Sequence, residues 1–246
     1  MTDFHERTLV LSGAAGGIAR EIVDIFWQQG ANLVLGDRDT DALERMRQRL
    51  DPAGARIAVQ ELDAASAGSN EALAALAADR FGSIDHLVLA AGVYPEQNIA
   101  EMTDAQWRTA LSVNLDGAFY LTRAALPHLR EGGSVVGLTS MAGHRGSRHH
   151  AHYAASKGGL LSFLRSLAWE TAPGVRVNAV SPGIIATSMT ADLVAEGGAH
   201  LLRSTPLGRY GTAAEVASVV AFLCGPGASF VHGEVIHVNG GLHMGG

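Results

Sequence analysis

The sequence has a single cysteine, more acidic than basic residues and no long hydrophobic run, and each shortage excludes a class of protein. Cys224 has no second cysteine to pair with, which excludes an internal disulfide framework and fits a reducing compartment. The 18 Lys and Arg residues face 24 Asp and Glu residues, giving a formal net charge of −6. Duplex nucleic acid is therefore not expected as a partner.

Membrane-targeting signals are also missing. The segment Met1–Arg7 is polar and lacks the hydrophobic core of a signal peptide, and no apolar stretch is long enough to span a bilayer. We therefore expect a cytoplasmic protein with no membrane partner.

What the sequence contains is typical of one α/β domain. Its 246 residues are 47% hydrophobic and include 30 glycines. A chain of this length buries a sizeable core without disulfides or structural metals. The composition fits a buried parallel sheet with tight turns between strands and helices.

Short apolar runs alternate with helical patterns along the whole chain. The expected strands are Thr8–Ser12, Asn32–Gly36, Arg56–Glu61, His86–Ala90, Ser134–Thr139, Arg176–Ser181 and Glu234–Val238. The expected helices are Ile18–Gln29, Thr40–Leu50, Asn70–Arg80, Asp104–His128, Tyr153–Thr171 and Ala213–Leu223. This alternation predicts a single Rossmann-type doubly wound domain, residues 1–246, with a seven-stranded parallel sheet and helices on both faces.

One segment departs from this alternation. Residues 184–210 form a long connection in which the Gly197-Gly198 pair interrupts a helical pattern. A long segment beside a site is often a substrate lid, which we expect here, and an irregular surface excursion is the alternative.

A glycine-rich turn follows the first strand. The residues from Ser12 to Ala19 include Gly13, Gly16 and Gly17 and run directly into a helix. Glycines let the backbone approach a pyrophosphate, and the helix N-terminus offers free N–H groups and the positive end of a dipole. Tight packing alone also explains such glycines, but their place between a strand and a helix favours dinucleotide binding.

Asp37 ends the second strand, about 20 residues past the glycine turn, where dinucleotide folds contact the adenosine ribose. Its carboxylate accepts hydrogen bonds from ribose hydroxyls and repels a 2′-phosphate, so NAD is expected and NADP less so. Arg38 weakens this argument because a guanidinium neutralises a 2′-phosphate. Alternatively, Asp37 caps the helix that begins near Thr40.

Four further residues make the pattern specific. Tyr153 and Lys157 form a Tyr-x-x-x-Lys motif, Ser140 lies at the end of the fifth expected strand, and Asn114 lies within a helix. In this order they resemble the motif of the classical branch of the short-chain dehydrogenase/reductase family. The resemblance extends over nearly the whole chain. The resemblance implies that these four residues are catalytic.

The resemblance also implies dinucleotide contacts and an assembly. The implied contacts are Gly13, Gly17, Ile18, Asp37, Asp63, Ala91, Gly92, Tyr153, Lys157, Pro182, Gly183, Ile185 and Thr187. Asp63 resembles the residue at the adenine ring, and Ile185 and Thr187 those that hold the carboxamide. Family members are mostly homotetramers, joined through the two long helices and the C-terminal strand, so a homotetramer is expected.

Two motifs, with three differing positions between them, depart from the family pattern. Ala19 stands where the glycine motif usually ends in glycine, and the family's Asn-Asn-Ala-Gly is replaced by Leu89-Ala90-Ala91-Gly92. Alanine is tolerated at the third place of related fingerprints, and the two asparagines mostly serve hydrogen bonding in the sheet. Neither difference touches the catalytic residues.

The chemistry explains why these residue types occur together. The nicotinamide transfers hydride, and the protein supplies orientation and a proton. Tyr153 is expected to act as general acid in reduction and general base in oxidation. Lys157, one helical turn away, is expected to lower the tyrosine's pKa as a nearby cation. Ser140 would hold the substrate oxygen, and Asn114 a water that links Lys157 to solvent.

Histidines and arginines crowd the stretch before Tyr153: His144, Arg145, Arg148, His149, His150 and His152. Acidic ligands are missing, two arginines would repel a cation and the expected reaction needs no metal, so no metal site is expected. A solvated loop is one interpretation. The other is that His144, His149 or His150 contacts a polar, anionic or polyhydroxylated substrate.

The expected function is an NAD-linked oxidoreductase acting on a small-molecule secondary alcohol, sugar or polyol and its ketone. A 3-oxoacyl thioester reductase is one alternative, although such enzymes commonly use NADPH, against which Asp37 argues. A catalytically silent dinucleotide-binding protein is the other. Such proteins usually lose the tyrosine or the lysine, and both are present here.

Overall fold

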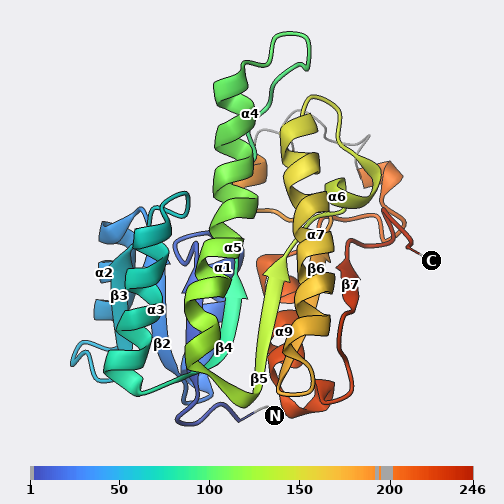
Figure 1. Ribbon diagram of the computed structural model, residues 1–246. Helices are drawn as coiled ribbons and strands as arrows, with labels where there is room; N and C mark the ends of the chain where they lie inside the picture. Colours follow the sequence, from blue (N-terminus) through green and yellow to red (C-terminus); the bar gives the residue numbers. More distant parts are fainter. Residues whose placement is uncertain (1–2, 192–193, 195–201, 246) are drawn as a thin grey trace.

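The computed structural model describes residues 3–191, 194 and 202–245. Its seven strands form one parallel sheet in the order β3-β2-β1-β4-β5-β6-β7 (Figure 1). The strands are β1 (Thr8–Ser12), β2 (Asn32–Asp37), β3 (Ile57–Glu61), β4 (Ile84–Leu89), β5 (Leu129–Leu138), β6 (Val175–Pro182) and β7 (Val235–Val238). The predicted fold class is confirmed.

The central strands are apolar because helices cover both of their faces. All residues of β1 and β4 are buried, and the two strands pair in register from Leu9 opposite His86 to Ser12 opposite Leu89. The chain order reverses between these neighbours, since β2 and β3 lie on one side and β5 to β7 on the other. Ligand crevices of doubly wound sheets lie at the carboxyl ends of strands at such a reversal.

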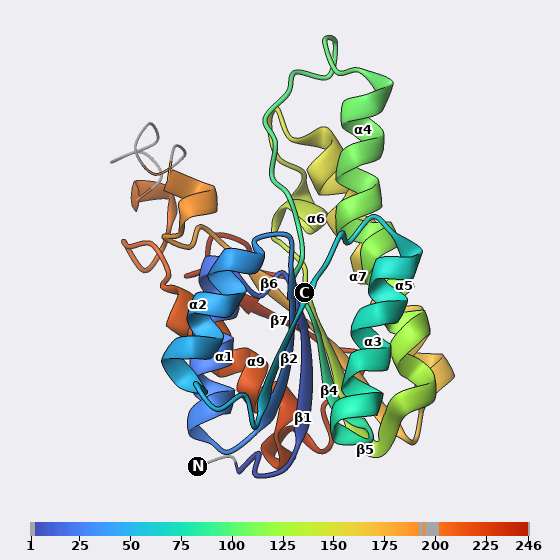
Figure 2. The same ribbon diagram turned by 90° about the vertical axis from the view of Figure 1, so that its left-hand side faces the viewer.

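Two helical layers enclose the sheet (Figure 2). Helices α1 (Gly17–Gln28), α2 (Thr40–Leu50) and α9 (Ala213–Cys224) cover one face, where Phe26 and Val220 belong to the core. Helices α3 (Ala67–Phe81), α5 (Gly117–Ala125) and α7 (Ala151–Thr171) cover the other, where Leu121 and Leu164 belong to a second core cluster.

Besides β5, which begins at Leu129 and not at the predicted Ser134, two helical features differ from the sequence prediction. The expected helix Asp104–His128 is divided into α4 (Asp104–Leu111), a π-helical turn η1 (Ser112–Asp116), α5 and a 3-10 turn η2 (Leu126–His128). Pro127 lies in the first turn of η2, where it lacks the N–H that a continuing α-helix requires. A short helix, α6 (Ala142–Arg145), follows β5 and was not predicted from the periodicity.

Part of the expected lid lies outside the described residues, namely 192, 193 and 195–201. Of the rest, Ser188–Thr190 form a 3-10 turn, η3. No helix in the described part of the chain combines the length and the apolarity needed to cross a membrane.

A histidine is buried within the sheet. His86 of β4 lies with Nδ1 2.9 Å from Ser134 Oγ, and its ring meets those of Phe4 and Phe26 edge-on. Burial lowers the pKa of His86 from 6.5 to about 4, aided by Arg176 and Arg7 and opposed by Asp85. The folded state therefore holds this imidazole neutral at a pH where the unfolded chain protonates it.

We expect the free energy of unfolding to fall as the pH drops from about 6.5 to about 4, by up to about 1.4 kcal/mol per pH unit from His86 alone. His86→Asn, whose amide can replace Nδ1, should flatten this dependence. Urea unfolding at several pH values measures it. His5→Asn, at an exposed position, should retain the wild-type slope, and an equal slope in the His86 variant would contradict the assignment.

Candidate active site

Three adjoining cavities lie at the carboxyl ends of the strands. The carboxylate cavity, about 160 Å³, is lined by Asp37 and Asp63. The central cavity, about 170 Å³, is lined by Lys157 and Thr187 and shares Gly13, Gly16, Ala90, Gly92 and Met189 with the carboxylate cavity. The arginine cavity, about 450 Å³, contains Ser140, Arg145 and Arg148 and shares Tyr153, Gly183, Met189 and Thr190 with the central one.

The residues predicted to contact a dinucleotide fall in the first two cavities. They are Gly13, Gly17, Ile18, Asp37, Asp63, Ala91, Gly92, Tyr153, Lys157, Pro182, Gly183, Ile185 and Thr187. Segments far apart in the sequence are thus brought together along one continuous channel.

The glycine turn is built for close approach. Gly13 has φ +69°, and a Cβ there would lie 2.7 Å from the Ala91 backbone, so only glycine fits without strain. Gly16 is the N-cap of α1 and supplies no side chain to occupy the N–H groups of the first helical turn. An anionic group such as a pyrophosphate fits this end of the helix.

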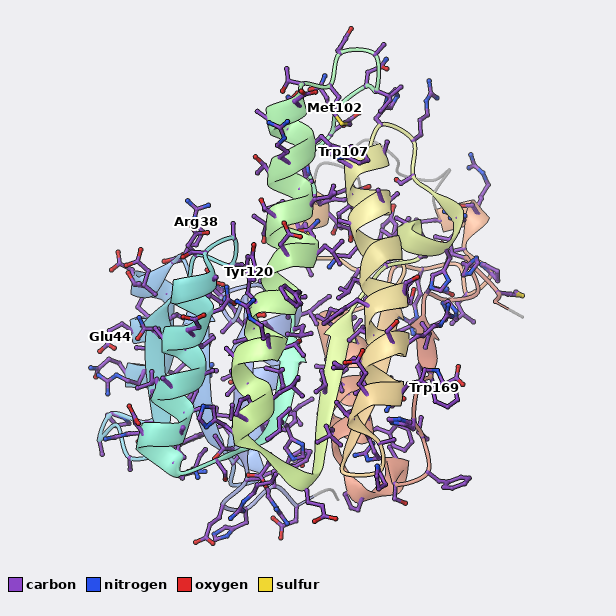
Figure 3. All side chains as sticks on the ribbon, in the orientation of Figure 1. Arg38, Glu44, Met102, Trp107, Tyr120 and Trp169 are labelled. Atoms are coloured by element: carbon purple, nitrogen blue, oxygen red, sulfur yellow. The ribbon has the colours of Figure 1, made fainter. Side chains whose placement is uncertain are left out.

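The carboxylate of Asp37 is fixed by two backbone donors. Its Oδ2 accepts from Ala15 N at 2.9 Å and its Oδ1 from Asp39 N at 3.0 Å. The capping interpretation does not hold, because the N-cap of α2 is Asp39, whose side chain accepts from Ala42 N. Arg38 is exposed (Figure 3) and also lines the carboxylate cavity, whereas Asp37 is held beside the glycine turn.

A serine holds the turn in which the family's two asparagines are replaced by Leu89 and Ala90. The Ser12 hydroxyl accepts hydrogen bonds from Ala90 N at 3.2 Å and Ala91 N at 3.3 Å. The turn after β4 is therefore tied to the end of β1 by a serine. Across the channel, a Cβ at Gly183 would lie 2.7 Å from Asn239 Cα, which accounts for the small residue after β6.

Asn114 lies in the π-helical turn η1 and is 1% exposed. Its Nδ2 donates to Val93 O and to Ser156 Oγ, each at 3.0 Å, and its Oδ1 accepts from Val93 N at 2.8 Å. Ser156 Oγ in turn donates to Tyr153 O at 2.7 Å. The extra residue of a π turn, common at functional sites, thus connects the β4 loop to the helix that carries Tyr153.

Lys157 is buried beside this network. Its Nζ donates to Leu138 O at 2.8 Å and lies 5.9 Å from the centre of the Tyr153 ring. Burial lowers the pKa of Lys157 to about 8. A Cβ at Gly92 would lie 3.5 Å from this nitrogen and 3.2 Å from Asn114 Oδ1, so a glycine at 92 keeps the space between them open.

Tyr153 differs from the sequence expectation in one respect. Burial raises the pKa of Tyr153 to about 12; a hydrogen bond with the Ser140 hydroxyl opposes this and Tyr94 adds to it. Desolvation therefore outweighs any lowering by Lys157. The protein holds Tyr153 as a protonated phenol, able to donate a proton.

Tyr94 belongs to the site and was missed. It lines the arginine cavity, meets the Tyr153 ring edge-on at 4.6 Å, and stacks on His150 at 3.9 Å between ring centres. Only its position two residues after Gly92, in the loop that follows β4, could have pointed to it.

The histidines expected at the substrate lie elsewhere. His150 is buried with Nδ1 2.8 Å from Pro95 O, and the carbonyl of His149 accepts from Gln97 N. Neither lines the arginine cavity, whereas Arg145 and Arg148 do. Positive charge, rather than imidazole, therefore borders the space next to Tyr153 and Ser140.

Comparison with known proteins agrees with this geometry. A family model described as enoyl-(acyl carrier protein) reductase matches residues 13–243. The 3-oxoacyl-(acyl-carrier-protein) reductase FabG of Salmonella typhimurium is 34% identical over 244 residues, 98% of this chain and 99% of that protein. Nodulation protein G of Rhizobium sp. is 35% identical over 247 residues, covering 99% and 100%.

A solved structure is also similar. It is described as a short-chain dehydrogenase/reductase, glucose/ribitol dehydrogenase, from Brucella melitensis. The TM-score is 0.97 at 50% sequence identity, with 99% of each chain covered.

The Gly13 contact predicts a selective loss of dinucleotide binding. Gly13→Ala places a Cβ against the Ala91 backbone, so the turn must shift and the affinity for NADH should fall at least tenfold, measured by fluorescence titration. Gly68→Ala, on the open surface of α3 with nothing within 4 Å, should bind as the wild type does. Equal affinity of both variants would show that the close approach is not needed.

Proposed function

The chain belongs to the short-chain dehydrogenase/reductase family of oxidoreductases, and we propose that it reduces the keto group of a 3-oxoacyl thioester with NADH. The observation that carries this is the position of Tyr153. Its side chain lines both the central cavity, whose residues fit a dinucleotide, and the arginine cavity, which has room for a substrate.

The relatives change the order of the sequence-based expectations. An alcohol, sugar or polyol was expected first, yet the curated relatives are named mainly as 3-oxoacyl-(acyl-carrier-protein) reductases. They favour the thioester reductase, which was the alternative. The polyol reaction stays as a second candidate because the Brucella structure is described as a glucose/ribitol dehydrogenase.

The chain's own residues account for the proton transfer and the orientation. A bound nicotinamide nucleotide supplies or accepts hydride. Ser140, through its hydroxyl, orients the substrate oxygen towards the Tyr153 phenol, which donates the proton. A phenol with a pKa of about 12 is protonated at neutral pH, which supports the reductive direction. Asn114 holds the helix that carries Tyr153 through its hydrogen bond to Ser156, and Lys157 lines the central cavity.

The arginine cavity supports an anionic carrier on the substrate. Arg145, the last residue of α6, and Arg148, in the loop that follows, are both exposed and line this cavity. Guanidinium groups bind phosphate and carboxylate through paired hydrogen bonds. An acyl group carried on a phosphate-containing thioester places its negative charge near these two arginines while the keto group reaches Tyr153.

NAD(H) is proposed over NADP(H) because of Asp37. Its carboxylate is fixed where the adenosine ribose is expected, and a 2′-phosphate there would be repelled. Like charges at 4 Å repel by about 1 to 4 kcal/mol, depending on the effective dielectric constant. The catalytically silent alternative is disfavoured, since Tyr153 and Lys157 line the same cavity.

We also propose a homotetramer built on α5 and α7. Phe119 of α5 is 41% exposed and its ring meets Phe163 of α7 edge-on at 6.3 Å. Trp169, further along α7, is 88% exposed (Figure 3). Exposed aromatic side chains on two adjacent helices are typical of a surface that a further subunit covers.

A substrate panel tests the function. Acetoacetyl thioesters should be reduced with a kcat/KM at least tenfold above that of polyols or sugars, and with NADH at least fivefold preferred over NADPH, measured by absorbance of the reduced nicotinamide. Tyr153→Phe should lower kcat about 10²- to 10⁴-fold while NADH still binds. Turnover of polyols alone would replace the first candidate with the second. No turnover despite NADH binding would favour the silent binder.

Light scattering coupled to gel filtration tests the assembly. The wild-type mass should be four times the 25.6 kDa of one chain. Phe119→Asp should shift it to smaller species because it buries a charge between subunits. Glu44→Ala, on the exposed side of α2 (Figure 3), should remain tetrameric. A monomeric wild type would reject the proposal.

A further inference from the structure

Three histidines from distant parts of the chain meet at one edge of the sheet. They are His144 of α6, His237 of the edge strand β7 and His243 of the C-terminal turn, which we call the three-histidine cluster. Figure 1 shows α6, β7 and the C-terminus on the same side of the molecule. Of the histidine-rich stretch before Tyr153, this cluster uses only His144.

The rings are close enough for one ion. One nitrogen from each imidazole lies within 4.8 Å of the other two, and the ring centres are 4.7 to 5.0 Å apart. Nitrogens about 2.0–2.1 Å from a shared metal lie about 3.4 Å apart in a tetrahedral site. Side-chain rotations that shift each nitrogen by about an ångström therefore bring the three nitrogens into coordinating positions.

Two of the imidazole nitrogens in the cluster make no hydrogen bond within the described residues. His144 Nε2 and His237 Nδ1 are buried, and neither has a hydrogen-bond partner among the residues that the structure describes. Buried polar atoms are normally paired. A site in which an ion accepts imidazole lone pairs explains why polar rings from three elements face one another without hydrogen bonds between them.

The backbone around the cluster is held in place. Asn239 Oδ1 accepts from Gly241 N at 2.9 Å, and its Nδ2 donates to His243 O at 2.7 Å. From the other side, Arg145 Nη1 donates to Leu242 O at 3.4 Å. These contacts fix the position from which His243 reaches its two partners.

We propose that His144, His237 and His243 bind one divalent transition-metal ion, Zn²⁺ or a similar borderline ion such as Co²⁺ or Ni²⁺. Three imidazoles without a carboxylate suit these ions and not Mg²⁺ or Ca²⁺, which prefer oxygen ligands. All three side chains are partly exposed, so water can complete the coordination. The ion would fasten the C-terminal turn to α6, two of whose residues, Ala142 and Arg145, line the arginine cavity.

Titration of the untagged protein, after chelator treatment and dialysis, tests the site. Calorimetry with Zn²⁺ should give one ion per chain, and Co²⁺ should give visible d–d absorption bands of a site with nitrogen ligands. Zn²⁺ should also raise the Tm. His144→Ala and His243→Ala should each weaken Zn²⁺ binding at least tenfold and abolish the shift in Tm.

The matched control is His149→Asn, from the same histidine-rich stretch but outside the cluster. His149 has φ +62°, a conformation that asparagine tolerates, so this variant should bind Zn²⁺ as the wild type does. Circular dichroism of each variant checks the fold; His243 lies close to the C-terminus, so its removal leaves the sheet intact. Neither the Zn²⁺ titration nor the measurement of Tm depends on the enzymatic reaction.

Three results would overturn the proposal. One is a wild-type protein that binds no Zn²⁺ or Co²⁺ at a protein concentration of tens of micromolar. Another is binding that persists unchanged in both alanine variants, which would place the ion elsewhere. Equal weakening by His149→Asn would likewise show that the loop, and not the cluster, holds the metal.

Discussion

Parallel strands that pair in register must end at the same edge of their sheet, and the site of this protein depends on that constraint. Ser12, Asp37, Ala90, Ser140 and Pro182 all follow or end strands of one sheet. These residues therefore lie close together in space although they are far apart in the sequence. The sheet is rigid because its central strands are buried on both faces, so the groups at its edge keep their positions without help from the ligand.

Burial gives the polar groups at this edge their chemical character. The same desolvation raises the pKa of Tyr153 and lowers that of Lys157, so that burial shifts each group towards its neutral form. The other end of the channel carries two carboxylates, Asp37 and Asp63. The two ends therefore differ in character before any ligand binds.

Much of the fold could be predicted because hydrophobic patterns report burial directly. The strand Thr8–Ser12 and the helix Thr40–Leu50 have the predicted bounds, since apolar residues stop where the elements stop. The π turn at Asn114 could not be predicted, because helical periodicity is nearly the same on both sides of it. The residues around the candidate site were found through motifs, whereas Tyr94 carries no motif. The meeting of His144 with His237 and His243 is a long-range contact that no local pattern reports.

The π turn at Ser112–Asp116 also limits how this part of the chain can change length. One residue corresponds to about 100° of rotation around an α-helix. Removing one residue from the turn would therefore rotate α4 relative to α5 by more than a quarter of a revolution, while Asn114 stays attached to Val93. Either the exposed face of α4, where Trp107 lies (Figure 3), or the Asn114 contacts would be lost. Substitutions of residues other than Asn114 are therefore more compatible with this segment than insertions and deletions are.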